Sequence, residues 1–300
     1  MEIRAINALA ALRAVLLAPG AERDREFVQQ VMEPTRPLWE TALQRMGAPT
    51  DTSGAVWEAA RRLCFYTPDR GPERALEALG RLEAAGAWEQ NLSDLRRASE
   101  ALAPAAHGVN LPALHFAFVL ADPDRMMPGT ALYTGATAGP GWAMLLAWPT
   151  DYNLPRLSAV SVHELHHQVR FGYEPLFPDL SLGKYLVAEG LAEAFAAELC
   201  GEVRLGPWAT TLTPADLEPL KPRYRAALQA SDFNEVRGYI FGDLEETGAW
   251  GVPKLGLPPY AGYAVGYRMV RAYLERSGRS AVEATYLPWQ EIVQGSGYLD

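Results

Sequence analysis

The sequence predicts an α+β fold that is predominantly helical, with a small sheet directly before a histidine-rich helix. Up to about residue 103, apolar residues recur at helical spacing between breaks rich in Pro and Gly. Two short apolar runs then follow, and from Pro155 onward the helical pattern returns. These observations predict a helical N-terminal region, residues 1–105, and a second domain, residues 106–300. An apolar fraction of 49% is ordinary for a chain that buries a substantial core.

The N-terminal region carries no cluster of metal-binding residues and is expected to be a helical scaffold. Its first helical segment, "AINALAALRAVLLAPG", also has the length of a signal-peptide core. Arg13 interrupts the apolar run and the cleavage-site pattern is poor, so an amphipathic helix is favoured. The helices expected here span residues 6–17, 25–46, 54–64, 73–86 and 92–102.

The sheet is expected from "LPALHFAFVLAD" at 111–122 and "GWAMLLAWP" at 141–149, both short and bounded by Pro, Gly or Asp. The Gly-rich stretch between them, 129–141, is expected to be a turn region, and its last part, "GATAGPG" at 135–141, a flexible rim. It lacks a following GK[ST], so phosphate binding is not expected. Residues 142–148 are either an edge strand that binds an extended peptide or an inner core strand, and the sequence leaves both open.

The helices of the second domain follow from apolar spacing and from Gly or Pro at their ends. Gly201 and Gly278 mark two of the ends. The expected ranges are 155–170, 182–200, 214–229, 232–241 and 259–276.

Three of the five histidines lie within five positions, in the motif His163-Glu164-Leu165-His166-His167. Residues four apart on a helix are about 40° and one turn from each other, so His163 and His167 can converge on one Zn²⁺. Glu164 can lean beside the metal without binding it, which is the HExxH arrangement. His166 projects to the other side and is interpreted as a flanking residue.

A catalytic zinc needs a third protein ligand and one open position. The next helix, 182–200, places Glu189 and Glu193 on one face among apolar residues, where carboxylates are costly to bury without a cation. Glu189 is the expected ligand, with Glu193 as an acceptor for a ligand histidine N–H. Alternatively, both simply face water. Gly190 costs the helix about 1 kcal/mol relative to Ala, and close approach of the two ligand-bearing helices would explain it.

The amino-acid composition indicates which classes of binding partner are not expected. Twenty-seven basic against 36 acidic residues give a net charge of −9, and no long basic run is present, so neither nucleic acid nor an anionic membrane is expected. No segment reaches the roughly eighteen uninterrupted apolar residues of a membrane span. Cys64 and Cys200 form no disulfide framework, which favours a reducing, cytoplasmic location.

The chain resembles the YjaZ-like group of predicted zinc-dependent proteases, a branch related to the gluzincins. The resemblance covers about residues 110–276 and rests on "VHELHH", "AEGLAEAFAAEL" and "PPYAGYAVGYRMVRAYL". Thermolysin-type gluzincins use two His and one Glu as ligands and the intervening Glu as base. The resemblance thus implies a peptidase-like fold, a peptide or protein substrate, Zn²⁺ held by His163, His167 and Glu189, and Glu164 as the base.

Two further expectations concern catalysis. Tyr263 and Tyr267 share a helix face, and either is a candidate donor to the developing oxyanion, with Tyr263 preferred; the alternative is that both rings fill the core. The rival to a peptidase is an inactive binding or regulatory protein with a structural zinc, closed by a fourth ligand from His166, His107 or Glu193. Hydrolysis of a non-peptide amide is the second rival. An intact Glu164 favours catalysis, because a structural site needs no base.

Overall fold

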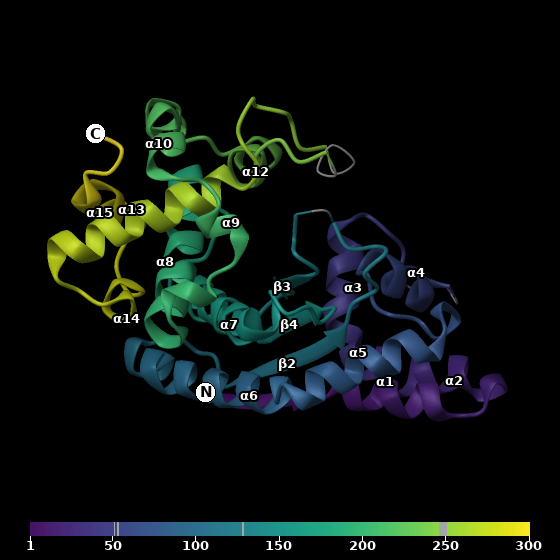
Figure 1. The fold of residues 1–300 in the computed structure, drawn as a ribbon. Coiled ribbons are helices and arrows are strands. Elements are labelled where there is room, and N and C mark those ends of the chain that lie inside the picture. Colours follow the sequence, from purple (N-terminus) through teal and green to yellow (C-terminus); the bar gives the residue numbers. More distant parts are fainter. Residues whose placement is uncertain (51, 53, 128, 246–250) are drawn as a thin grey trace. The chain divides into compact units, whose positions relative to one another are not determined.

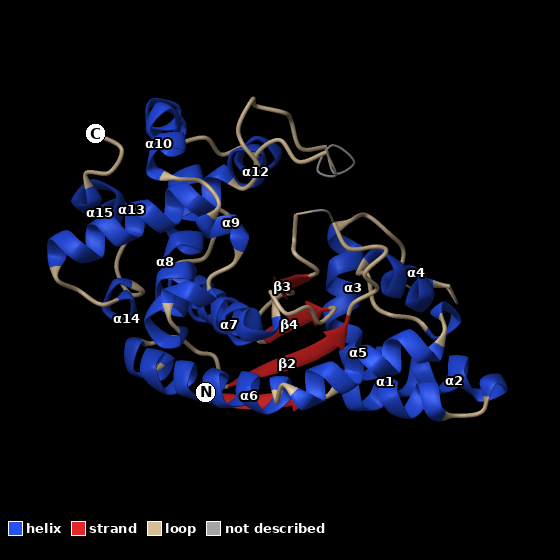
Figure 2. Ribbon diagram, in the orientation of Figure 1, coloured by secondary structure: helices blue, strands red, loops and turns tan. Residues whose placement is uncertain are grey.

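The computed structural model describes residues 1–50, 52, 54–127, 129–245 and 251–300, mostly helical with one four-stranded sheet (Figures 1 and 2). The chain forms two compact units. The first unit holds residues 1–100 and 111–168, and the second unit holds 101–110 and 169–300. The expected division near residue 105 stays a prediction. None of the helices in the described ranges combines the length and the hydropathy needed to cross a bilayer.

The sheet lies in the first unit and consists of β1 (Glu2–Ile6), β2 (Ala113–Leu120), β3 (Tyr133–Thr137) and β4 (Trp142–Ala147). The strand order is β1-β2-β4-β3, with β1, β2 and β4 parallel and β3 antiparallel to β4. β2 and β4 were expected, whereas β1 and β3 were not. β4 is therefore an inner strand, and β3 occupies the edge of the sheet.

The helices of the first unit follow the expected segments with two exceptions. The helix expected over 92–102 already begins at Ala87. The range 25–46 is not a single helix: a π-helical turn and a 3₁₀ turn, spanning Val28–Thr35, divide it, and Pro34 and Pro37 lie at the starts of the new segments. Proline lacks the N–H that a continuing helix needs, which explains the breaks. α1 packs against β2 and α5. The helices are α1 (Ala8–Leu17), α2 (Arg23–Phe27), α3 (Arg36–Arg45), α4 (Ala55–Arg62), α5 (Pro72–Ala84) and α6 (Ala87–Leu102).

α7 (Leu157–Tyr173) carries the HExxH motif and packs on the sheet through side chains described below. α8 (Leu182–Cys200) has the expected bounds: the Ser181 side chain caps its start, and Gly201 follows its end. The remaining helices of the second unit are α9 (Pro207–Thr210), α10 (Pro214–Leu217), α11 (Lys221–Ala227), α12 (Phe233–Phe241), α13 (Ala261–Ser277), α14 (Ala281–Ala284) and α15 (Trp289–Ser296). The single helix expected over 214–229 is interrupted by a 3₁₀ turn at Glu218–Leu220.

The core of the second unit is built on α8 and α13, which lie against each other. A Cβ added at Gly190 of α8 would overlap the carbonyl oxygen of Gly266 in α13, and one added at Gly266 would overlap the carbonyl oxygen of Leu186. Glycine is thus required on both sides of the contact. The close approach expected at Gly190 exists, but the approaching helix is α13 rather than α7.

Candidate metal centre

α7 presents His163 and His167 one turn apart, as the HExxH spacing predicts. Both side chains are buried, at 7% and 6% exposure. Their rings meet edge to face, with centroids 4.4 Å apart and planes at 88°. Neither ring is surrounded by water, and the burial of two polar rings so close together is costly without a compensating interaction.

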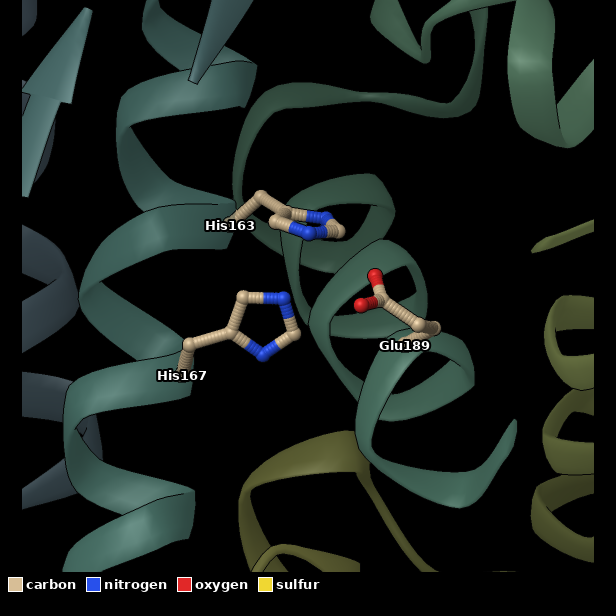
Figure 3. A group of neighbouring side chains, drawn as sticks. All are labelled: His163, His167 and Glu189. Atoms are coloured by element: carbon tan, nitrogen blue, oxygen red, sulfur yellow. The ribbon is translucent and has the colours of Figure 1, made fainter. Parts of the chain in front are cut away.

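The third member of the group is Glu189 of α8, which is 3% exposed. One potential ligand atom from each of His163, His167 and Glu189 lies within 4.8 Å of the others. Figure 3 shows both rings pointing from α7 toward the Glu189 carboxylate. Within the described ranges, no fourth His, Cys, Asp or Glu belongs to this group.

The donor set fits zinc. Neutral imidazole nitrogens and one carboxylate oxygen are the ligands of catalytic zinc sites, which hold the metal with three protein residues. A buried carboxylate is costly without a cation, and a Zn²⁺ bound here would offset that cost. The three residues expected from the sequence thus lie together, and their role as zinc ligands stays a prediction.

Glu164, beside His163 in the chain, is 7% exposed and rests on strand β3. The Thr137 hydroxyl donates to its Oε2 at 2.6 Å. Gly135 faces the same carboxylate, and a Cβ there would lie 2.7 Å from Cδ of Glu164. The Glu164 side chain, which is expected to act as the base, thus lies against Gly135 and Thr137 of β3. The sequence pattern did not reveal this strand.

Gln168, which directly follows His167, fixes α7 to the hairpin formed by β3 and β4. Its Oε1 accepts from the Gly141 N–H at 2.6 Å, and its Nε2 donates to the carbonyls of Gly139 at 3.0 Å and Trp142 at 2.9 Å. The side chain is only 5% exposed. Two of these hydrogen bonds, those with Gly139 and Gly141, hold the Gly-rich segment that was expected to be a flexible rim. The sequence pattern did not single out Gln168.

Glu193, one turn after Glu189, is 2% exposed and accepts from Nε1 of Trp208 at 2.5 Å. Trp208 lies in α9 and was not singled out by the sequence pattern. This contact shows that a buried carboxylate on α8 is satisfied by an indole donor. The expected hydrogen bond from a ligand histidine to Glu193 stays a prediction.

The two tyrosines of α13 differ in their surroundings. Tyr267 is buried, and its hydroxyl donates to Oε1 of Glu202 at 2.9 Å. Burial, and then this hydrogen bond, raise the pKa of Tyr267 above its ordinary value. Tyr263 is half-buried, and its ring lies 6.1 Å from those of Tyr260 and Phe241. The oxyanion role of either tyrosine stays a prediction.

The histidines named for a closed, four-ligand site lie elsewhere in the described chain. His166 is fully buried on α7 but does not join the group of His163, His167 and Glu189. His107 stacks on Tyr286 within the second unit, with ring centroids 3.7 Å apart. Neither provides a fourth ligand in this group.

The family to which similar proteins belong is consistent with a zinc site at His163, His167 and Glu189. A profile of the family described as "Predicted Zn-dependent protease (DUF2268)" matches residues 91–294. The uncharacterized protein YjfC of Bacillus subtilis (strain 168) is 33% identical over 277 residues, which is 92% of each chain. The uncharacterized protein YjaZ of the same organism is 29% identical over 148 residues, 48% of this chain and 52% of its own. No solved structure matches. The chain belongs to the DUF2268 family of predicted Zn-dependent proteases.

Proposed function

We propose that this protein is a zinc-dependent peptidase that hydrolyses peptide bonds with Glu164 as general base. The observation that carries the proposal is the buried group of His163, His167 and Glu189, with no fourth ligand in the described chain. Three protein ligands with one position left for water or substrate distinguish catalytic zinc sites from structural ones. The family to which the chain belongs supports the same reaction class.

Each residue of the site has one role in the proposed reaction. His163 and His167 would hold Zn²⁺ through imidazole nitrogens, and Glu189 would hold it through its carboxylate. The metal would supply Lewis acidity and lower the pKa of water toward about 7. Glu164 accepts a proton from the attacking water and returns it to the departing amine. Since Thr137 donates to Oε2, the other oxygen, Oε1, is the one assigned to the proton transfer.

The donor to the developing oxyanion is assigned to Tyr263. Tyr267 is the weaker candidate because its hydroxyl donates to Glu202 and the whole side chain is buried. A phenol that retains its proton can stabilise an oxyanion by hydrogen bonding. Glu193 is assigned a supporting role as a buried acceptor near the ligand Glu189 in α8, where Trp208 already donates to it.

A peptide substrate is favoured over a small amide by the position of β3. This strand lies at the edge of the sheet and carries the residues that seat Glu164. An extended peptide can add to such an edge through main-chain hydrogen bonds. Because β3 lies at the edge and β4 in the interior of the sheet, we propose β3 as the strand to which the substrate adds.

The experiment that tests the proposal compares the zinc-loaded wild type with the Glu164→Gln variant on a peptide library. The amide is nearly isosteric but cannot accept the proton, so we expect the variant to keep its zinc and fold and to lose roughly 10²-fold or more in turnover. Equal cleavage by both proteins would show that Glu164 is not the base. A wild type that holds zinc but cleaves no peptide would favour the inactive binding protein, and cleavage of simple amides alone would favour the second rival.

A further inference from the structure

Two residues of strand β3, Gly135 and Thr137, lie against the Glu164 carboxylate. Gly135 and Thr137 are two apart in an extended strand, so they occupy the same face of the sheet. Both face Glu164 of α7. The sequence separation of 27 residues between Thr137 and Glu164 means that only the fold brings them together.

The two contacts have complementary effects on the carboxylate. The Thr137 hydroxyl carries one proton, and its short bond to Oε2, at 2.6 Å, directs that proton to the carboxylate; the backbone oxygen of Glu164 lies farther away, at 3.4 Å. Gly135 supplies room, because a Cβ there would lie 2.5 Å from Cγ of Glu164. Thr137 bonds one oxygen of the Glu164 carboxylate, and Gly135 leaves room for the same group. Together these two residues define one position for the carboxylate.

We propose that Thr137 is a positioning residue, which acts through Glu164 by holding one carboxylate oxygen so that the other can take the proton from water, and that Gly135 provides the space for this arrangement. The inference rests on the proposed function for its catalytic consequence. The placement of the carboxylate itself is independent of that function. Thr137 touches no reacting atom in this scheme, so its effect on rate passes entirely through the base.

The central test compares Thr137→Val with Thr137→Ser in the zinc-loaded protein. Valine keeps the shape and removes the donor, whereas serine keeps the donor. A hydrogen bond to a charged group corresponds to about 10-fold to 100-fold in rate. We expect kcat for peptide hydrolysis to fall by about that factor in the valine variant with KM and zinc content unchanged, and to be largely restored in the serine variant.

A second readout does not depend on activity. In crystal structures of the zinc-loaded proteins, we expect the Glu164 carboxylate to keep its place beside residue 137 in the wild type and in Thr137→Ser. In Thr137→Val it should move or occupy more than one conformation. Gly135→Ala should displace the same carboxylate by steric overlap, which checks the second half of the proposal.

Thr35→Val is the matched control, because it also removes a buried hydroxyl, one that donates to the Val31 carbonyl at 2.8 Å. It should lower stability without changing kcat or the Glu164 position. An unmoved carboxylate with unchanged kcat in Thr137→Val would overturn the proposal, as would equal losses in the valine and serine variants. If the wild type hydrolyses no peptide, the proposed function fails, while the crystallographic comparison still decides the placement.

Discussion

The two helices that carry the metal-binding side chains are held in place by different kinds of contact. α7 is fixed by buried polar side chains: Gln168 makes three hydrogen bonds to the β3–β4 hairpin, and the Ser161 hydroxyl donates to Oδ1 of Asn91 at 2.5 Å. α8 combines close packing with two carboxylate contacts. Gly190 lies against the backbone of α13 and a Cβ at Gly183 would overlap the ring of Trp289, while Glu193 accepts from Trp208 and Glu198 from the Ala281 N–H. Hydrogen bonds to the sheet and to α6 therefore hold the histidine-bearing helix, whereas glycine-mediated close packing is the feature peculiar to the helix that bears Glu189.

The largest effect is expected at α13, the helix against which α8 packs. Tyr263→Phe should retain zinc and lose roughly 10²-fold or more in turnover, as removal of one oxyanion donor does. Tyr267→Phe should leave turnover nearly unchanged and lower the free energy of unfolding by about 1 kcal/mol, because its hydroxyl bonds Glu202. Steady-state kinetics and thermal unfolding separate the two. Unchanged turnover in both variants would leave α13 a packing role alone.

The packing of α8 is tested by Gly190→Ala. The added methyl would meet the Gly266 backbone, which has little freedom to move, so we expect a loss of about 1–3 kcal/mol in the free energy of unfolding. Gly80→Ala is the matched control: Gly80 lies in α5, and a Cβ there meets no atom within 4 Å. That control should gain up to about 1 kcal/mol from helix propensity. Similar denaturation midpoints for both variants would contradict close packing as the anchor of α8.

The polar anchor of α7 is tested by Gln168→Leu, which removes the bonds to the hairpin at nearly constant volume. The Gly141 N–H would lose its acceptor in a buried position, which costs about 1–2 kcal/mol. Gln30→Leu, at an exposed position in the first unit, should change stability by no more than about 0.5 kcal/mol. If urea denaturation finds the two variants equally stable, hydrogen bonding is not what holds α7.

The sequence predicted those parts of the site that depend on helical spacing. His163, His167 and Glu189 follow from one-turn spacing and from the cost of burying a carboxylate, and both are local properties. The bounds of α8 were also predicted, and Gly201 marks its end. These features need no knowledge of what lies across the fold.

The strands that were missed show where local patterns carry too little information. β1, "EIRAI", is short and largely exposed, with no alternating apolar face. β3, "YTGAT", contains a glycine and two threonines and so has the composition of a turn. Gly135 is a glycine because Glu164 lies over it, and that contact exists only after β3 and α7 come together. The partner of Gly190 was assigned wrongly for the same reason, since spacing along one helix does not identify the helix beside it.

Zinc content of the purified protein tests the central claim most directly. Elemental analysis of the wild type should find about one Zn²⁺ per chain, because the group offers one set of three ligands. His163→Ala and His167→Ala should each lose the metal, and Glu164→Gln should keep it, since Glu164 is a base and not a ligand. Full zinc occupancy in both histidine variants, or none in the wild type after loading, would contradict the account.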